Sequence, residues 1–175
     1  MRSERRASGV AAVALTALAL VGSATGERGA LQELTGISGV RSVLLVRDHT
    51  LVEEWYRTPG DRGPTNIKSA SKSMISALVG IALEEELLPS LDAPVTELLP
   101  GHADLLAEPP RDGITLRHLL SMTAGLASTS GDAYGAWVSG EDWVGGALSK
   151  PLEARPGEEF IYSTGSTHVV AAILD

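Results

Sequence analysis

The chain has 175 residues, of which 43% are hydrophobic and 21% charged, which suits one folded domain and excludes a disordered tail. A net charge of −8 argues against a nucleic-acid partner, because phosphate binding requires clustered Lys and Arg side chains. The sequence contains no cysteine, so disulfides, thiolate metal ligands and cysteine nucleophiles are excluded.

The beginning of the chain has the pattern of a signal peptide. Three arginines among the first six residues precede an apolar run over residues 9–22, which is too short to span a bilayer. Small residues at positions 22 and 24 fit a cleavage after Ala24, and an N-terminal anchor or a buried helix is the alternative. We expect residues 1–24 to be a signal peptide and residues 25–36 a linker. The processed protein would then be exported, either periplasmic or secreted, and would have no stable membrane span.

Two β-prone runs follow and predict an antiparallel hairpin. Residues 40–46 and residues 51–56 are rich in apolar side chains. Between them, Asp48, His49 and Thr50 have the composition of a tight turn. We therefore expect the folded part of the chain to begin with two short strands.

From Ser71 the apolar residues follow a helical period. Five of them recur at spacings that share one helix face: Ile75, Leu78, Val79, Ala82 and Leu83. Pro89 ends this helix, and further helical segments are expected over residues 93–99, 115–122, 141–148 and 166–174. Strands followed by helices predict an α+β fold, in which an antiparallel sheet packs with helices. Because a lone hairpin is a poor sheet, we expect this fold to be incomplete at the C-terminus.

Ser69 and Lys72 form a Ser-x-x-Lys pattern at the start of the strongest predicted helix. At this spacing the hydroxyl and the amine lie on one face, one turn apart, so a partly desolvated lysine can accept the serine proton. The helix N-terminus adds backbone N–H groups that stabilise a nearby oxyanion. The structural alternative is that Ser69 or Ser71 caps the helix and Lys72 is a solvated side chain.

Tyr162 is the second candidate for chemistry. It lies in residues 156–165, where a Pro-Gly turn leads into an extended piece and then into a loop before a helix. A tyrosine near a cation such as Lys72 can act as a general base or relay a proton. The alternative is that Tyr162 is an aromatic side chain packed in the core.

Other aromatic and histidine residues are weaker candidates. Tyr134 and Trp137 lie in a Gly-rich segment and could line a substrate cleft, with core or loop packing as the alternative. Trp55, Tyr56 and Trp143 could line the same cleft. We expect His49 and His118 to be surface or structural residues, and no Gly-x-Ser-x-Gly elbow surrounds any serine.

Three segments together resemble a family of serine hydrolases. They are Ser69-Ala-Ser-Lys72, the run from Ile114 to Leu126 with its His-Leu-Leu and Thr-Ala-Gly, and the run from Pro156-Gly to Tyr162-Ser-Thr164. Their order and approximate spacing are similar to those of class C β-lactamases, D-Ala-D-Ala carboxypeptidases, family VIII esterases and 6-aminohexanoate-oligomer hydrolases. The resemblance covers residues 37–175, which we expect to be the N-terminal part of a β-lactamase- or DD-peptidase-like domain.

The resemblance implies a serine hydrolase that cleaves an amide or an ester through an acyl-enzyme. Ser69 would be the acylated nucleophile, Lys72 its activating partner and Tyr162 the general base that protonates the leaving group. Thr164 stands where the family often has Asn, and its hydroxyl can still donate a hydrogen bond to a substrate. A β-lactam, a D-amino-acid peptide, a short ester and a linear amide all fit this chemistry. No cofactor, metal or nucleotide is required, and no feature predicts an oligomeric state.

The third motif of the resembled family is missing from this sequence. It is a Lys-Thr-Gly, His-x-Gly or Gly-Gly element on a strand long after the tyrosine, whereas the sequence stops at Asp175. The remaining strands of the sheet and one of the two N–H donors of the oxyanion hole are missing with it. Loss of one such donor typically lowers the catalytic rate by about 10²–10³-fold. We therefore expect a part of a longer enzyme. The alternative is a truncated, inactive family member with at most a binding role.

Overall fold

The computed structural model describes residues 24–175, which divide into two compact units with a boundary between Lys68 and Ser69. The predicted signal peptide lies outside the described residues, except for Ala24, with which the first helix begins. Each unit has its own internal contacts.

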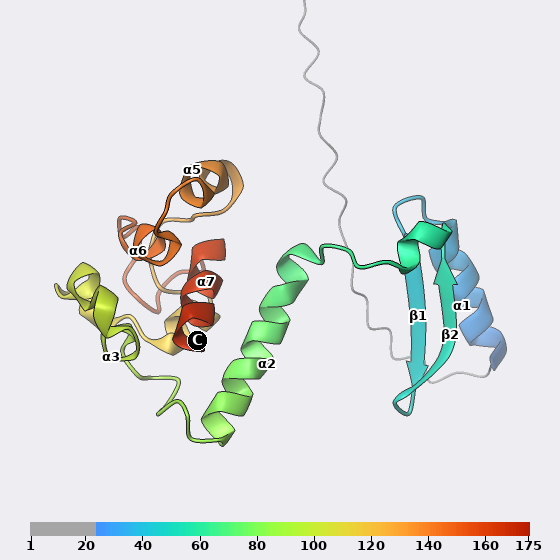
Figure 1. Ribbon diagram of the computed structural model, residues 1–175, viewed down its shortest axis with the longest axis horizontal. Helices are drawn as coiled ribbons and strands as arrows, with labels where there is room; N and C mark the ends of the chain where they lie inside the picture. The colour runs from blue at the N-terminus through green and yellow to red at the C-terminus, as the bar shows by residue number, and fades with distance from the viewer. Residues whose placement is uncertain (1–23) are drawn as a thin grey trace, which may run out of the picture. The chain divides into compact units, whose positions relative to one another are not determined.

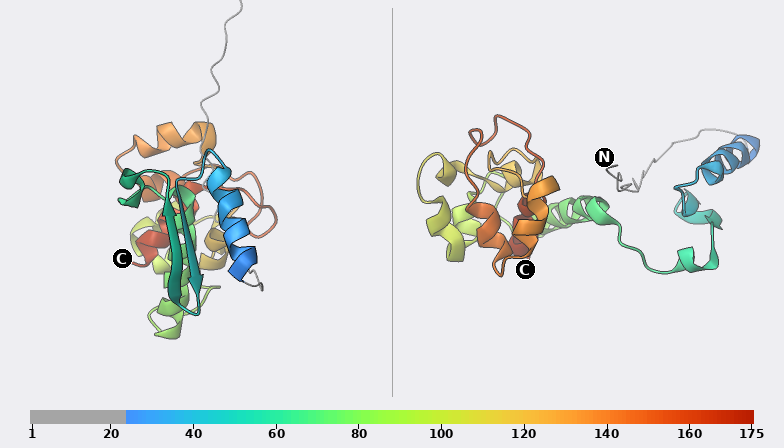
Figure 2. Two further views of the ribbon diagram at one scale, coloured as in Figure 1. Left: turned by 90° about the vertical axis from the view of Figure 1, so that its right-hand side faces the viewer. Right: turned by 90° about the horizontal axis from the view of Figure 1, so that it is seen from above.

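The first unit consists of a helix and a hairpin. Helix α1 spans Ala24–Gly36, strand β1 spans Ser42–Arg47 and strand β2 spans Thr50–Tyr56. Helix α1 lies alongside the hairpin in both views of this unit (Figure 1; Figure 2, left). The segment that the sequence suggested as a linker, residues 25–36, is therefore helical.

The predicted hairpin is confirmed, and its turn explains the pairing of the residues next to it, before a register shift between Leu45 and Val46. The strands pair antiparallel, with Arg47 opposite Thr50. The two residues between them, Asp48 and His49, have φ angles of 47° and 62°. Two successive residues with positive φ make a type I′ turn, whose twist matches that of the flanking strands. His49 is exposed in this turn, as the sequence indicated.

The second unit is helical. Six α-helices follow one another and are joined by short 3-10 helices and loops: α2 over Ser71–Glu84, α3 over Val95–Leu98, α4 over Leu116–Leu120, α5 over Tyr134–Val138, α6 over Trp143–Leu148 and α7 over Thr164–Ile173. The sequence predicted each of these helices except α5. Helices together with an antiparallel hairpin confirm the α+β class, with a sheet of only two strands among the described residues.

Helix α7 occupies the centre of the second unit. It contacts α2, α4 and α6, and it carries the red end of the chain in Figure 1. The side chains that these contacts remove from water include Val79, Leu116, Leu119, Leu148, Val169 and Val170. Burying one such side chain contributes about 1.5–3 kcal/mol to stability, so this packing fixes where α7 begins. The beginning of α7 follows Tyr162 by two residues.

Helix α2 buries only part of the face that its periodicity predicts. Val79 and Ala82 are buried against the core, as expected. Leu78, which the apolar spacing placed on the same face, is 50% exposed, and Met74 is 62% exposed. The apolar residues of α2 thus extend around the helix, and those on one side are uncovered within the described chain.

Backbone pairing supports the loop that carries Tyr162. The segment from Met122 to Gly125 pairs with the segment from Glu153 to Ile161 through three backbone hydrogen bonds of 2.8 Å. The Met122 carbonyl accepts from the Ile161 N–H, the Thr123 carbonyl from the Gly157 N–H and the Gly125 carbonyl from the Glu153 N–H. Gly125 has a φ of 77°, and a Cβ there would collide with the carbonyl oxygen of Ala154. The Thr-Ala-Gly segment noted in the sequence is therefore the scaffold on which this loop rests.

Candidate active site

Ser69 lies in a short 3-10 turn, Lys68–Ala70, that runs directly into α2. Ala70 occupies the N-cap position of α2. The alternative that Ser69 or Ser71 caps this helix is therefore wrong. Lys72 lies one helical turn after Ser69, and its Nζ donates a hydrogen bond of 3.4 Å to Ser69 Oγ. The i, i+3 spacing thus brings the amine to the hydroxyl, as the sequence predicted.

Tyr162 reaches the same hydroxyl from the loop before α7. Its phenolic group donates a hydrogen bond of 2.7 Å to Ser69 Oγ. The Nζ of Lys72 lies 5.4 Å from the centroid of the Tyr162 ring, within cation–π range. Tyr162 is 41% exposed, so the alternative of a core aromatic is wrong. A hydroxyl, an amine and a phenol therefore meet at a solvent-accessible point.

The surroundings of Tyr162 favour its phenolate form. Partial burial of the phenol acts to raise its pKa, but the hydrogen bonds with Ser69 and Lys72 and the positive charge of Lys72 outweigh this effect. The net result is a pKa of Tyr162 below its ordinary value near 10. A tyrosine with a lowered pKa accepts a proton from a neighbouring hydroxyl more readily at neutral pH than an ordinary one.

A cluster of hydroxyl groups holds the Tyr162 loop in place. Ser128 Oγ donates a hydrogen bond of 2.7 Å to the backbone carbonyl of Tyr162. The hydroxyls of Thr129 and Ser163 lie 3.0 Å apart, and the Thr129 N–H donates to Ser163 Oγ at 3.2 Å. Thr129 and Ser163 are almost completely buried, where an unmade hydrogen bond would be costly. The sequence reasoning missed these residues, although the Ser-Thr-Ser run after the Thr-Ala-Gly segment is their signal.

The start of α7 is fixed by the same cluster. The Gly165 N–H donates a hydrogen bond of 2.7 Å to Thr129 Oγ1, and Ser130 Oγ accepts one of 2.8 Å from the Thr164 N–H. A Cβ at Gly165 would lie 2.7 Å from the Cβ of Ala147 and 2.8 Å from Thr129 Oγ1. Glycine is therefore needed where the start of α7 packs against α6.

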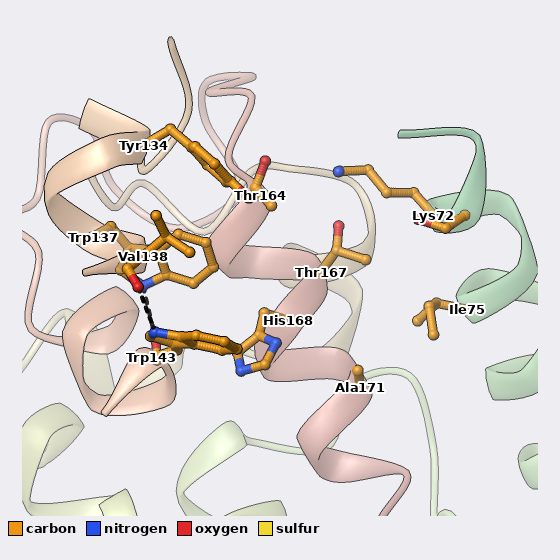
Figure 3. A pocket seen from close by; sticks show the side chains of 11 residues that line it. Lys72, Ile75, Tyr134, Trp137, Val138, Trp143, Thr164, Thr167, His168 and Ala171 are labelled. Atoms are coloured by element: carbon orange, nitrogen blue, oxygen red, sulfur yellow. Dashed lines mark hydrogen bonds between the residues drawn. The ribbon is translucent and has the colours of Figure 1, made fainter. Parts of the chain in front are cut away.

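A cavity of about 350 Å³ lies beside Lys72 and is walled by α2, α5, α6 and α7 (Figure 3). Its lining contains the three residues that the sequence proposed for substrate binding, Thr164, Tyr134 and Trp137. Trp137 is buried at 8% exposure, whereas Tyr134 is 46% exposed at the rim. The structure thus brings these residues together next to the Ser-Lys-Tyr group.

On the face of α7 that lines the cavity, the sequence reasoning gave a role to Thr164 alone. Thr164, Thr167, His168 and Ala171 all line the cavity, at the i, i+3, i+4 and i+7 spacing of a helix face. The ring of His168 contacts Trp137 and Trp143 edge-on, at centroid distances of 5.8 Å and 5.5 Å. A helical-face analysis that began at Thr164 would have found this set.

The weaker candidates have structural roles. The Nδ1 of His118 accepts a hydrogen bond of 3.2 Å from the Thr115 N–H in the capping box of α4, as expected for a structural histidine. Trp55 and Tyr56 belong to β2 in the first unit, where the guanidinium groups of Arg57 and Arg62 lie over their rings.

Residues 24–175 contain no helix with the length and apolarity that crossing a membrane requires. No group of three or more His, Asp or Glu side chains in this part of the chain is arranged to hold a metal ion.

Comparisons with known proteins concern the chain as a whole. The family model described as Beta-lactamase matches residues 28–175. An uncharacterised protein of Alkalihalophilus pseudofirmus is 30% identical over 122 residues, which are 64% of this chain and 34% of that protein.

Solved structures share the fold at lower identity. A Bacillus anthracis protein assigned as a 6-aminohexanoate-dimer hydrolase superposes with a TM-score of 0.61 at 20% identity, over 84% of this chain and 41% of its own. A Bacteroides dorei protein assigned as a β-lactamase gives a TM-score of 0.60 at 20% identity, over 86% of this chain and 45% of its own. The chain therefore spans between a third and a half of the length of these relatives. The family match extends over most of the sequence, and the chain belongs to the Beta-lactamase family.

Proposed function

We propose that this chain carries the nucleophile of a serine hydrolase that cleaves an amide or an ester through an acyl-enzyme at Ser69. The observation that carries the proposal is the meeting of three side chains at one oxygen. Ser69 Oγ lies 2.7 Å from the Tyr162 hydroxyl and 3.4 Å from Lys72 Nζ. Membership of the Beta-lactamase family supports hydrolase chemistry in general.

Acylation begins with the transfer of a proton from Ser69. The Tyr162 phenolate, stabilised by the charge of Lys72, accepts the proton of the Ser69 hydroxyl while Oγ forms a bond to the carbonyl carbon of the substrate. The C–N or C–O bond of the substrate then breaks, and Tyr162 returns the proton to the leaving nitrogen or oxygen. Water then attacks the carbonyl carbon of the acyl-enzyme and gives a proton to Tyr162. The bond between that carbon and Ser69 Oγ breaks, and Tyr162 returns the proton to Oγ, so that the acid is released and Ser69 is regenerated.

The local structure supports this assignment of roles. Ser69 lies two residues before the first residue of a helix of 14 residues, where the backbone dipoles favour negative charge on a nearby oxygen. Tyr162 is oriented by Ser128, Thr129 and Ser163, which hold its loop through hydrogen bonds. Substrates of this class are small molecules or peptides with an accessible carbonyl, including β-lactams, D-amino-acid peptides, short esters and linear amides.

The test is the intact mass of the protein, purified from its own host, after brief exposure to p-nitrophenyl acetate. We expect one acetyl group on the wild-type protein and none on Ser69→Ala. Ser73→Ala is the matched control, because Ser73 is an exposed serine on the same helix and its loss should leave labelling unchanged. Tyr162→Phe should slow acetylation by about 10²–10⁴-fold, the usual contribution of a general base.

Two results would contradict the proposal. One is equal acetylation of the wild type and Ser69→Ala, which would mean that another group reacts. The other is a cooperatively folded wild-type protein that is not acetylated at all. That result would favour the alternative of an inactive family member with a binding role.

We also propose that the protein is exported. The proposal is based on the basic start, the apolar run over residues 9–22 and the small residues before the expected cleavage after Ala24.

A further inference from the structure

A histidine closes the N-terminal cap of α4, the helix that precedes the Thr-Ala-Gly scaffold of the Tyr162 loop. The Thr115 N–H donates a hydrogen bond of 3.2 Å to His118 Nδ1, and the His118 N–H donates one of 3.4 Å to Thr115 Oγ1. This reciprocal pair is a capping box, in which the third helical position is usually Glu or Gln. Here the acceptor at that position is a ring nitrogen, which can itself take up a proton.

The protonation state of His118 decides whether this capping box closes. A neutral imidazole has one N–H and one acceptor nitrogen, and because Nδ1 accepts here, the proton of the neutral ring is on Nε2. A second proton must bind at Nδ1, where its N–H would then face the N–H of Thr115. Histidine is the side chain that ordinarily takes up a proton between about pH 5 and pH 8. The capping box therefore requires the neutral ring and opens in acid.

The other nitrogen of the same ring lies against the Tyr162 loop. A Cβ at Gly157 would lie 3.2 Å from His118 Nε2, so the imidazole packs directly on the backbone of this loop. Gly157 has a φ of 90°, a conformation that favours glycine, and no side chain separates the ring from the loop there. His118 is half-buried. A ring that turns away from the Thr115 N–H must therefore move against the loop.

Backbone hydrogen bonds connect the same helix to the loop. The His118 carbonyl accepts a bond of 2.8 Å from the Thr123 N–H, and the Thr123 carbonyl accepts one of 2.8 Å from the Gly157 N–H. Gly157 precedes Tyr162 by five residues. Helix α4 has only five residues, so few hydrogen bonds within the helix remain to hold it once its cap is lost. Loss of the cap therefore weakens the support of the loop that carries Tyr162.

The elements packed around His118 also carry charged and titratable groups: Asp92, Arg117, Arg155, Glu158 and His168. A hydrogen bond with Arg117, and then the charges of Arg117 and His118, lower the pKa of the Asp92 carboxyl. Asp92 thus attracts a positive charge on His118, and its ion pair with Arg117 opposes that attraction. Arg155 and Glu158 are exposed, of opposite sign and on either side of Gly157 in the loop. The ring of His168, on α7, contacts two tryptophans.

We propose that His118 is an acid-sensitive latch for the Tyr162 loop. The neutral ring closes the cap of α4 and supports the loop, whereas protonation at Nδ1 opens the cap and releases the loop. Release withdraws the Tyr162 hydroxyl from Ser69 Oγ, so Ser69 acylation is switched off reversibly in acid. The latch itself is a property of the fold, and its consequence for Ser69 rests on the proposed function.

The test compares the full chain with a variant whose cap does not take up a proton. His118→Gln places a usual capping-box residue at the same position, and its amide accepts a hydrogen bond at every pH used. His49→Gln is the matched control, because His49 is exposed in the hairpin turn. If circular dichroism shows that His118→Gln does not fold, His118→Asn is the second variant, since its amide oxygen can take the place of Nδ1.

Hydrogen–deuterium exchange of the Gly157 and Ile161 amides measures release of the loop without depending on turnover. Exchange is compared at about pH 7.5 and about pH 5.5 and corrected for the intrinsic effect of pH. We expect protection in the wild type to fall by about 3- to 30-fold in acid, the usual effect of losing a helix cap. The loss should be absent in His118→Gln and unchanged in His49→Gln.

Equal loss of protection in the wild type and His118→Gln, or no loss in the wild type, would overturn the latch. Acetylation of Ser69 by p-nitrophenyl acetate is measured in parallel. Its rate should fall in acid in every variant as Tyr162 takes up its proton, and about threefold to tenfold further in the wild type than in His118→Gln. Acetylation with the same pH dependence in both would overturn the latch and leave the proposed function standing. No acetylation at any pH, with exchange that still depends on His118, would overturn the proposed function and support the latch.

Discussion

The Tyr162 hydroxyl donates a hydrogen bond of 2.7 Å to Ser69 Oγ, although 93 positions separate the two residues in the sequence. The bond joins the loop before α7 to the turn before α2. Its length depends on where each of these helices begins, and those positions are set by the buried contacts of the second unit. A change in the core or in the hydroxyl cluster should therefore be detected at Ser69.

The charge of Lys72 should control the pH dependence of Ser69 acylation. A lowered pKa means that the Tyr162 phenolate forms at lower pH than in an ordinary tyrosine. The acetylation rate should therefore rise with pH along a limb whose midpoint lies below 10, the ordinary value. Lys72→Met removes a hydrogen bond and a positive charge, so the pKa of Tyr162 should rise and the limb should move to higher pH. Ultraviolet difference spectra of phenolate formation measure the same shift, and Tyr162→Phe identifies which tyrosine titrates. An unchanged titration in Lys72→Met would contradict this coupling.

Thr129 should act as a positioning residue for Tyr162. Thr129→Val retains the shape of the side chain but removes the hydroxyl that bonds to Ser163 and accepts from the Gly165 N–H. Leaving these buried groups without partners should cost about 1–3 kcal/mol in the free energy of unfolding and slow Ser69 acetylation. Thr129→Ser restores the hydroxyl and should rescue the acetylation rate, which a loss of packing alone would not allow. Thr123→Val is the control, since the Thr123 hydroxyl bonds at the surface to Ser121. Denaturant titration and acetylation kinetics are the measurements, and full activity in Thr129→Val would contradict the assignment.

Gly165 should not tolerate a side chain. In Gly165→Ala the new Cβ would lie 2.7 Å from that of Ala147, so α6 and α7 must separate. We expect a loss of about 1–3 kcal/mol in the free energy of unfolding, the usual cost of overpacking. Gly135→Ala in α5 is the matched control, because no atom lies within 4 Å of its added Cβ. That substitution should stabilise the helix by about 0.4–1 kcal/mol. Equal melting temperatures for the two variants would show that the helices do not approach each other so closely.

Export predicts a defined N-terminus. If the signal peptide is removed after Ala24, protein isolated from the periplasm or the medium should begin at Thr25. N-terminal sequencing checks this directly. Replacing Ala24 with a bulky residue, as in Ala24→Phe, should block processing and leave a longer chain at the membrane. A cytoplasmic protein that begins at Met1 would contradict the proposal.

Local sequence was sufficient for the features that depend on neighbouring residues. The hairpin follows from two apolar runs around Asp48 and His49, and the approach of Lys72 to Ser69 follows from their i, i+3 spacing on one helix turn. It was less informative where the same residues fit more than one environment. Leu78 has the spacing of a core residue and is half exposed, and the short helix α5 has no clear amphipathic period.

The sequence by itself determined that a hairpin precedes a helical segment and that Ser69 and Lys72 lie together at the start of a helix. It also determined that Tyr162 belongs to a loop that precedes a second helix. These features depend on backbone sterics and on contacts within a few residues, which the order of residues specifies directly. Only the tertiary structure decided that Tyr162 reaches Ser69, that Thr129 and Ser163 hold it there, and that His168 joins two tryptophans around a cavity. Those relationships result from the burial of apolar side chains between α2, α4, α6 and α7, and this packing brings together residues that the sequence keeps far apart.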